Sequence, residues 1–464
     1  MSRADAINLG YLVTIVTFIL ALKFLSSPAH ARLGTWFGAA GMAIAVGVTF
    51  AQPGLTNYWS ILAVMAVFAP IGWYAARAVK MTAMPQMVAL FNGVGGGAAA
   101  LVALAEFHAI APDPGRLPTE SSVSSVLSAL IGSVSFAGSM IAFGKLQDLI
   151  SGQPITYPGQ KVGNLVLLAA LVGIGIAIVA GVENQWLFVV LIAGSLLFGV
   201  LFVLPIGGAD MPVVISLLNA ATGVAASATG FVLHQNVLIV SGMLVGASGT
   251  LLTLKMARAM GRSVSNVLFG AFGQVQISGD AAAAAGDGQV RSASAEDVAV
   301  MLAYARRVII IPGYGLAVAQ AQHDVRKLAD ELERRGVDVR YAIHPVAGRM
   351  PGHMNVLLAE ANVPYDQLHE MDEINSDFPE TDVALVIGAN DVTNPAARNQ
   401  PGSPIYGMPI LDVDRAQNVV VIKRSMNPGF AGIDNPLYRD PKTVMLFADA
   451  KDAVAALVSD VKAL

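Results

Sequence analysis

Two glycines separated by one residue stand between a short apolar segment and a helical pattern. Pro312-Gly313-Tyr314-Gly315-Leu316-Ala317-Val318 directly follows the β-branched segment Val308–Ile311. In such a strand–turn–helix, the first glycine permits a tight turn and the second lets the backbone approach a pyrophosphate at the helix N-terminus. Val318 stands where the pattern usually has a third glycine, and an ordinary strand–helix turn is the alternative interpretation. The context favours a dinucleotide site.

The residues that follow two other predicted strands indicate which dinucleotide to expect. The second strand, Val337–Ile343, ends at His344-Pro345, without the acidic residue that binds the ribose of NAD. The fourth strand, Val419–Ile422, leads into Lys423-Arg424-Ser425, where two basic side chains and a hydroxyl suit a 2′-phosphate. A solvated pair of surface charges is the alternative interpretation. The pattern predicts NADP(H) rather than NAD(H).

Two further loops carry candidate ligand contacts. Arg349 lies in the Pro- and Gly-rich stretch 344–353, and Asp391 lies in 388–395, after the third strand, Val383–Ile387. Ligands collect at the carboxyl ends of parallel strands, although a turn or cap role for Asp391 is an equal alternative. The chain has no cysteine, and none of its seven histidines has metal-ligand neighbours in the sequence. We therefore expect no metal site and no catalytic side chain.

A parallel sheet is needed to bring these loops together. Besides the four strands, Val444–Phe447 predicts a fifth, Ala317–Arg335 predicts one amphipathic helix, and Asp449–Ala463 predicts a closing helix. Short apolar strands that alternate with helices are typical of an α/β domain with a parallel, Rossmann-like sheet.

The part of the chain that precedes these strands has the composition of a segment surrounded by lipid rather than by water. The whole sequence is 55% hydrophobic and only 13% charged, whereas soluble domains carry about 25% charged residues. Residues 1–265 hold 11 Lys/Arg and 7 Asp/Glu, against 17 and 25 in the shorter remainder. This distribution predicts a membrane domain over residues 1–265, a Gly/Ala-rich flexible linker over 266–295 and a soluble domain over 296–464.

Nine apolar stretches are long enough to cross roughly 30 Å of hydrocarbon. They are Leu9–Leu25, Gly34–Ala51, Tyr58–Ala76, Gln86–Glu106, Val123–Phe143, Gly163–Val182, Trp186–Pro205, Pro212–Leu233 and Val237–Met256. One side of this arrangement holds nine Lys/Arg, namely Lys23, Arg32, Arg77, Lys80, Lys145, Lys161, Lys255, Arg258 and Arg262, and the other holds only Arg3 and Arg116. The positive-inside rule then predicts an external N-terminus and a cytoplasmic C-terminal domain.

Polar residues inside the spans are candidates for a proton path. Asn92, Ser139 and Asn219 lie within spans, where polar groups need partners. Asp210 and Arg262 lie at the predicted cytoplasmic ends, where an ion pair is one interpretation, and a helix cap with a positive-inside anchor is the other. The glycines at 93, 95, 96 and 97 and the pair Gly242/Gly246 predict close helix contacts.

Taken together, these segments resemble the β subunit of proton-translocating nicotinamide nucleotide transhydrogenases. The resemblance is carried by 312–322, 344–355, 388–395 and 423–426, and in the membrane part by 143–146 and 206–214. It covers essentially the whole chain except the linker.

The resemblance implies a set of NADP(H) contacts and a lid. The contacts are Gly313, Tyr314, Gly315, Ala317, Val318, Val346, Gly348, Arg349, Met350, Gly388, Asn390, Asp391, Lys423, Arg424, Ser425, Met426, Gly429, Phe430, Asp449 and Ala450. Asp391 would lie near the nicotinamide, where it is the candidate for coupling. The lid would be Asn427–Gly432, with Phe430 in place of the usual tyrosine. Asn92 stands where some members have a histidine, so a histidine of the partner subunit would take the proton-carrying role.

The resemblance also implies partners and a location. An α subunit would supply the NAD(H) domain and further membrane helices, in a dimer of αβ units in a bacterial inner membrane, with no nucleic acid. The expected reaction is hydride transfer between NAD(H) and NADP(H), coupled to inward proton movement. A channel or transporter regulated by a nucleotide-binding domain is the alternative from another class.

Overall fold

The computed structural model describes residues 3–27, 30–55, 57–80, 83–110, 119–147, 149–151, 154–182, 184–207, 210–260, 263–269, 289–349, 352–401, 403, 405–427 and 432–464. The chain forms two compact units that divide between Thr253 and Leu254. Each unit has its own core.

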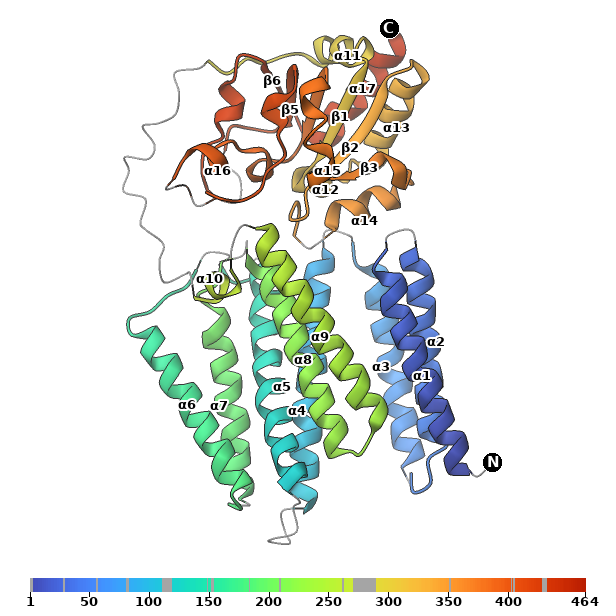
Figure 1. Cartoon of the computed structure of the whole chain (residues 1–464), viewed down its shortest axis with the longest axis vertical. Helices are drawn as coiled ribbons and strands as arrows, with labels where there is room; N and C mark the ends of the chain where they lie inside the picture. The colour runs from blue at the N-terminus through green and yellow to red at the C-terminus, as the bar shows by residue number, and fades with distance from the viewer. Residues whose placement is uncertain are drawn as a thin grey trace. The chain divides into compact units, whose positions relative to one another are not determined.

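The first unit is a bundle of apolar helices (Figure 1). Nine of the described helices are long and apolar enough to cross a membrane: α1 (Arg3–Leu25), α2 (Ala31–Phe50), α3 (Tyr58–Ala78), α4 (Met84–Ile110), α5 (Thr119–Leu146), α6 (Gln160–Val179), α7 (Gln185–Val203), α8 (Met211–Val232) and α9 (Asn236–Ala259). Each predicted span falls on one of them, which confirms the nine-span prediction.

Helices α5 and α8 form the centre of the bundle because small residues let their neighbours approach. A Cβ atom built on Gly132 of α5 would lie 2.6 Å from the carbonyl oxygen of Gly96 in α4. A Cβ atom on Gly242 of α9 would lie 2.4 Å from the backbone nitrogen of Ser227 in α8. Neither contact leaves room for a side chain, so the prediction of close helix contacts at these glycine clusters is confirmed.

The second unit is built on a parallel sheet of six strands: β1 (Arg307–Pro312), β2 (Asp338–Ile343), β3 (Leu368–Glu370), β4 (Val383–Ile387), β5 (Asn418–Lys423) and β6 (Thr443–Phe447). The order is β3-β2-β1-β4-β5-β6. Helices α11 (Ala295–Ala303) and α13 (Gln322–Arg334) pack against α17 (Ala450–Ala463) (Figure 1). The described residues of β1 and β4 are almost all buried, as expected for a sheet covered on both faces.

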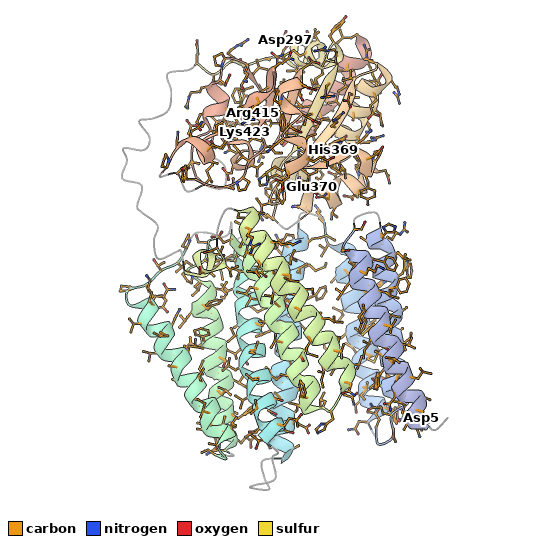
Figure 2. All side chains as sticks on the ribbon, in the orientation of Figure 1. Asp5, Asp297, His369, Glu370, Arg415 and Lys423 are labelled. Carbon is orange, nitrogen blue, oxygen red and sulfur yellow. The ribbon has the colours of Figure 1, made fainter. Side chains whose placement is uncertain are left out.

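Two elements differ from the sequence-based predictions. The single helix expected over Ala317–Arg335 is two helices, α12 (Tyr314–Ala319) and α13, because Gln320 between them has a φ of 53° that a helix cannot continue through. Strand β3, which holds His369 and Glu370 (Figure 2), was not predicted. Its three residues are too few to show an alternating pattern.

The segment expected to be a linker lies partly in folded structure. Helix α10 covers Val264–Phe269. Ser292 forms a parallel bridge with Met445, and the N–H of Ala293 donates to the carbonyl oxygen of Met445. Residues 270–288 lie outside the described residues, so the linker prediction stays a prediction for them.

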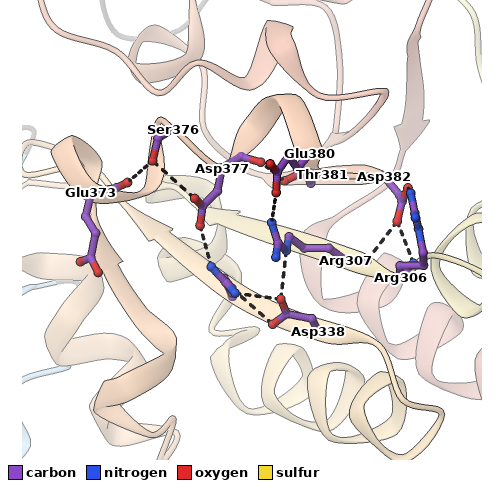
Figure 3. A network of polar contacts seen from close by, with 10 residues as sticks. Arg306, Arg307, Asp338, Glu373, Ser376, Asp377, Glu380, Thr381 and Asp382 are labelled. Carbon is purple, nitrogen blue, oxygen red and sulfur yellow. Dashed lines mark hydrogen bonds and ion pairs between the residues drawn. The ribbon is translucent and has the colours of Figure 1, made fainter.

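Charged residues tie the amino ends of the strands together (Figure 3). Asp382, just before β4, accepts hydrogen bonds from the backbone N–H groups of Arg306 and Arg307 at 2.8 and 3.1 Å. Arg307 also bonds to Asp338 at the start of β2, 3.0 Å away. This network lies at the edge of the sheet opposite the carboxyl ends, so it holds the strands without occupying the candidate ligand site.

Asp382 is expected to support the sheet only while its carboxylate is charged. Partial burial raises its pKa, but hydrogen bonds from Arg307 and Arg306 outweigh burial and leave the pKa below the ordinary 3.8. Stability from a lowered carboxyl pKa is present above the unfolded-state value and is lost as the pH falls through the folded-state value. We expect Asp382→Ala to cost about 1–3 kcal/mol at neutral pH and to cost progressively less below about pH 4.

Hydrogen exchange of the β1 and β4 amides in the assembled protein measures this difference. The exposed Asp366→Ala is the control and should leave these amides unchanged. A difference between Asp382→Ala and wild type that persists undiminished at pH 2 would contradict the role of the charge.

Candidate functional site

The strand order reverses between β1 and β4, and the turns that follow these two strands pack closely against each other. The N–H of Gly313 donates to the carbonyl oxygen of Ile387, and the N–H of Gly315 donates to that of Gly388, both at 2.9 Å. A crevice at the carboxyl ends of strands that diverge in this way is the usual ligand position in such sheets. The predicted glycine turn therefore lies at the expected edge.

The structure gives a different reason for these glycines. Gly313 has a φ of −121°, which any residue adopts, so the turn itself does not require glycine. What requires it is contact: a Cβ atom there would lie 2.4 Å from the backbone nitrogen of Ala389. The helix that follows, α12, has only six residues, and Val318 is 47% exposed while Leu316 and Ala317 are buried.

The loop after β2 folds back onto the glycine turn. The guanidinium carbon of Arg349 lies 4.7 Å from the centre of the Tyr314 ring, and the rings of Tyr314 and His353 are 6.1 Å apart. Burial and the charge of Arg349 lower the pKa of His353, so its Nδ1 accepts the hydrogen bond from the Arg349 N–H. A cation stacked on an aromatic ring is thereby fixed at the carboxyl edge of the sheet.

His344 holds the start of the same loop. It is buried, its Nδ1 lies 3.2 Å from the N–H of Val346, and its Nε2 lies 2.8 Å from the carbonyl oxygen of Pro409. Burial lowers the pKa of His344 to about 4, so the ring is neutral at pH 7. A neutral ring with one donor and one acceptor satisfies both contacts. Sequence reasoning missed this structural role, since a lone histidine carries no spacing signal.

The basic pair lies where β5 ends. Lys423, labelled in Figure 2, is the last residue of β5 and is partly buried, and Arg424 and Ser425 are exposed. The Lys423 ammonium donates to the carbonyl oxygen of Asn427 and lies 5.0 Å from the centre of the Tyr438 ring. Burial lowers the pKa of Lys423, opposed by the charges of Asp391 and Asp434. A phosphate at this edge would meet two cations and a hydroxyl.

Two buried residues that sequence reasoning missed complete this part of the site. Asn435 and Tyr438 are each 1% exposed. Asn435 is the N-cap of a short 3-10 helix, Pro436–Arg439, and Tyr438 lies within that helix. Both bond to Asn390, which follows β4. No motif signals them in the sequence, because their roles depend on a contact almost 50 residues away.

The remaining predicted contacts lie at the same edge or outside the described residues. Asp449 caps α17, accepting from the N–H of Lys451 at 3.1 Å, and Ala450 is the first residue of that helix, three positions after the end of β6. Val346, Gly348 and Met426 lie in the loops after β2 and β5. Met350, Gly429 and Phe430, with most of the predicted lid, and Arg262 lie outside the described residues.

In the membrane unit, two of the predicted polar residues meet. The amide nitrogen of Asn92 donates to the hydroxyl of Ser139 at 2.9 Å, and both residues are buried. The same amide reaches Ser135 at 3.4 Å, and Ser135 is hydrogen-bonded to Thr222 of α8. The structure therefore adds Ser135 and Thr222 to the predicted pair, in a polar cluster between α4, α5 and α8.

Two other predicted residues lie elsewhere in the unit. Asn219 is exposed on α8 and outside this cluster. Asp210 precedes α8 at the N-cap position, but its side chain makes no capping hydrogen bond, so the cap interpretation is not supported. The proposed pair with Arg262 cannot be placed on the described residues.

Comparison with known proteins identifies the family. A family model described as the NAD(P) transhydrogenase beta subunit matches residues 7–460. Two relatives from Rhodospirillum rubrum, one of them from a particular strain, are both named NAD(P) transhydrogenase subunit beta. Each is 50% identical to this chain over 455 residues, which cover 97% of both sequences. The chain belongs to the family of NAD(P) transhydrogenase β subunits.

Proposed function

We propose that this subunit binds NADP(H) at the carboxyl edge of its sheet and couples hydride transfer with NAD(H) to inward proton movement. The observation that carries the proposal is the placement of Lys423 and Arg424 at the end of β5, the strand next to β4, where the strand order reverses between β4 and β1. Membership of an enzyme family removes the alternative of a regulated channel. Adding NADH and an oxidised NADP analogue to membranes that contain both subunits tests the reaction directly.

The preference for NADP(H) rests on what stands at the ends of β2 and β5. An acidic residue after β2 would bind an unesterified ribose, but His344 is there, already bonded to Val346 and Pro409. Lys423, Arg424 and Ser425 instead offer charge-assisted hydrogen bonds to a 2′-phosphate. Arg349, stacked on Tyr314, is a second cation for the phosphates of the nucleotide.

The NAD(H) partner of the reaction would be bound by another chain. A β subunit implies an α subunit, and the described residues of the second unit form one parallel sheet, whose strand order reverses once. We propose that the α subunit carries the NAD(H) domain and further membrane helices, and that two αβ units assemble as a dimer in the bacterial inner membrane.

A membrane domain attached to a hydride-transfer domain has an energetic purpose. The two nucleotide couples have nearly equal potentials, so the reaction alone has little driving force. One proton that moves through roughly 200 mV contributes about 4.6 kcal/mol. At 1.4 kcal/mol per tenfold, this favours NADPH formation by roughly a thousandfold. We propose the cluster of Asn92, Ser139, Ser135 and Thr222 as part of the proton path.

The orientation of the nine helices in the membrane can be tested by locating the segments that join them. The excess of Lys/Arg at one set of helix ends supports a cytoplasmic C-terminal domain. A reporter inserted after Arg262 should be cytoplasmic, and one within 109–120, between α4 and α5, should be external. Accessibility labelling of intact cells makes the distinction. Labelling of both positions from the same side would contradict the nine-span topology.

Asp210 is proposed to communicate the proton state at the end of the bundle. Because coupling requires that protonation favour one nucleotide state, Asp210→Asn should lower proton pumping and the energised reverse rate. A reaction that cycles bound NADP(H) against NAD(H) analogues should persist. Pumping assays in vesicles with both subunits measure the ratio of protons to hydride. A variant that pumps at the wild-type ratio would show that Asp210 has no part in coupling.

A further inference from the structure

The amide side chain of Asn390 has one orientation that its neighbours permit. An amide has a donor end and an acceptor end, and the two are distinguished by their hydrogen-bond partners. The backbone N–H of Leu437 can only donate, and it contacts Oδ1 of Asn435 at 3.0 Å. The other end of Asn435 is therefore its NH₂ group. This group lies 3.1 Å from Oδ1 of Asn390 and 3.1 Å from the Asn390 carbonyl oxygen.

The hydroxyl of Tyr438 acts on the same end of Asn390. It donates to Oδ1 of Asn390 at 2.7 Å and lies 3.4 Å from the carbonyl oxygen of Ala389. If the Asn390 amide were reversed, two NH₂ groups would face each other. The acceptor end of Asn390 is thus occupied by two donors, and its NH₂ group must point the other way.

That NH₂ group has an unused hydrogen-bonding capacity. The nitrogen Nδ2 of Asn390 is shielded from solvent and has no hydrogen-bond partner among the described residues. A buried donor without an acceptor is costly, and native proteins rarely keep one without a reason. Asn390 is the third residue after β4, and Gly388, the first residue after that strand, packs on Gly315. The unused donor therefore belongs to the candidate nucleotide site.

We propose that Asn435 and Tyr438 are positioning residues that hold Asn390 with its NH₂ group toward bound NADP(H), where it donates to an oxygen of the nucleotide. This inference rests on the proposed function. Tyr438 also links the two loops of the site, because its ring lies 5.0 Å from the Lys423 ammonium while its hydroxyl holds Asn390. An oxygen of the nucleotide would then accept the hydrogen bond from Nδ2 of Asn390, for which the described residues offer no acceptor.

Substitution of Asn435 by aspartate replaces the hydrogen-bond donor that faces Oδ1 of Asn390 by an acceptor. A carboxylate at 435 cannot donate to Oδ1 of Asn390, but it accepts from Nδ2, so Asn435→Asp should turn the amide and present its oxygen to the nucleotide. We expect the NADP⁺ dissociation constant of the complete αβ enzyme to rise about tenfold for Asn435→Asp and for Asn390→Ala. Tyr438→Phe, which removes one oxygen atom, should raise it about threefold. Calorimetric titration of nucleotide-depleted enzyme with NADP⁺ gives these values.

A double variant separates positioning from general stabilisation. If Asn435 acts through Asn390, adding Asn435→Asp to Asn390→Ala should cause no further loss, whereas independent structural effects would add. Asn418→Asp is the matched control, since Asn418 makes a similar amide-to-carbonyl bond to Asp382 at the opposite edge of the sheet. Its NADP⁺ affinity should equal that of wild type.

Parallel titration with adenosine 2′,5′-bisphosphate locates the acceptor. A loss confined to NADP⁺ assigns the acceptor to the nicotinamide half, and an equal loss with both ligands assigns it to the adenosine half. Wild-type enzyme that fails to bind NADP⁺ would overturn the proposed function and this inference with it. Wild-type enzyme that binds NADP⁺ while Asn390→Ala and Asn435→Asp leave its affinity unchanged, or lose affinity additively, would overturn the inference alone.

Discussion

Replacing Lys423 and Arg424 together by alanine is expected to weaken NADP⁺ binding by at least about a hundredfold. Hydrogen bonds to charged groups contribute about 1.5–3 kcal/mol each, and each 1.4 kcal/mol is a factor of ten. The lower bound is used because Arg424 is exposed, which weakens its interaction. Calorimetry on the αβ enzyme should also show that the variant has lost its preference for NADP⁺ over NAD⁺.

A matched control is available on the outer face of α13. Lys327 and Arg334 are likewise one lysine and one arginine, each paired with an acidic residue three positions earlier. Their double replacement by alanine should leave NADP⁺ affinity unchanged. If the Lys423/Arg424 variant bound NADP⁺ within twofold of wild type, the pair would be no more than solvated surface charge.

Gly388→Ala is expected to disrupt the site through the backbone. Gly388 has a φ of +66°, and a Cβ atom there would lie 2.5 Å from Cα of Gly315 and 2.6 Å from the nitrogen of Leu316. Neither atom is the end of a flexible side chain, so the turns after β1 and β4 must separate. We expect a local destabilisation of about 2–5 kcal/mol from strain and overpacking together, and the loss of measurable NADP⁺ binding.

Gly336→Ala separates the two causes. Gly336 also has a positive φ, +86°, but nothing lies within 4 Å of a Cβ atom built there. It should cost only the conformational part, about 1–2 kcal/mol, and leave NADP⁺ binding intact. Hydrogen exchange of β1 and β4 amides and NADP⁺ titration of both variants provide the comparison. Equal effects of the two substitutions would mean that close packing at Gly388 is unimportant.

The sequence predicted an element wherever lipid or a covered sheet surrounds a whole segment and so requires a run of apolar residues. The nine spans and five of the six strands follow from runs of apolar residues, because lipid and a covered parallel sheet both demand them. Strand β3 and the break at Gln320 were missed, since three residues show no period and a left-handed glutamine has no sequence signal.

For the site, the sequence could name residues but not their partners. Turn glycines and a basic pair after strands were recognisable because backbone geometry and charge restrict residue type. The contacts of Asn435 and Tyr438 with Asn390 join positions 45 and 48 residues apart, and only the folded sheet brings them together. The same holds for Ser135 and Thr222, which are ordinary small polar residues until α5 and α8 pack.

The most direct test of the central claim is hydride transfer under an imposed proton gradient. Proteoliposomes containing both subunits would receive NADH and an oxidised NADP analogue, and reduction of the analogue would be followed by absorbance. A gradient directed toward the side of the nucleotide domain should accelerate reduction and shift the final ratio toward the reduced analogue, and an uncoupler should abolish both effects. A rate and a final ratio that are the same with and without the gradient would contradict coupling between the two units.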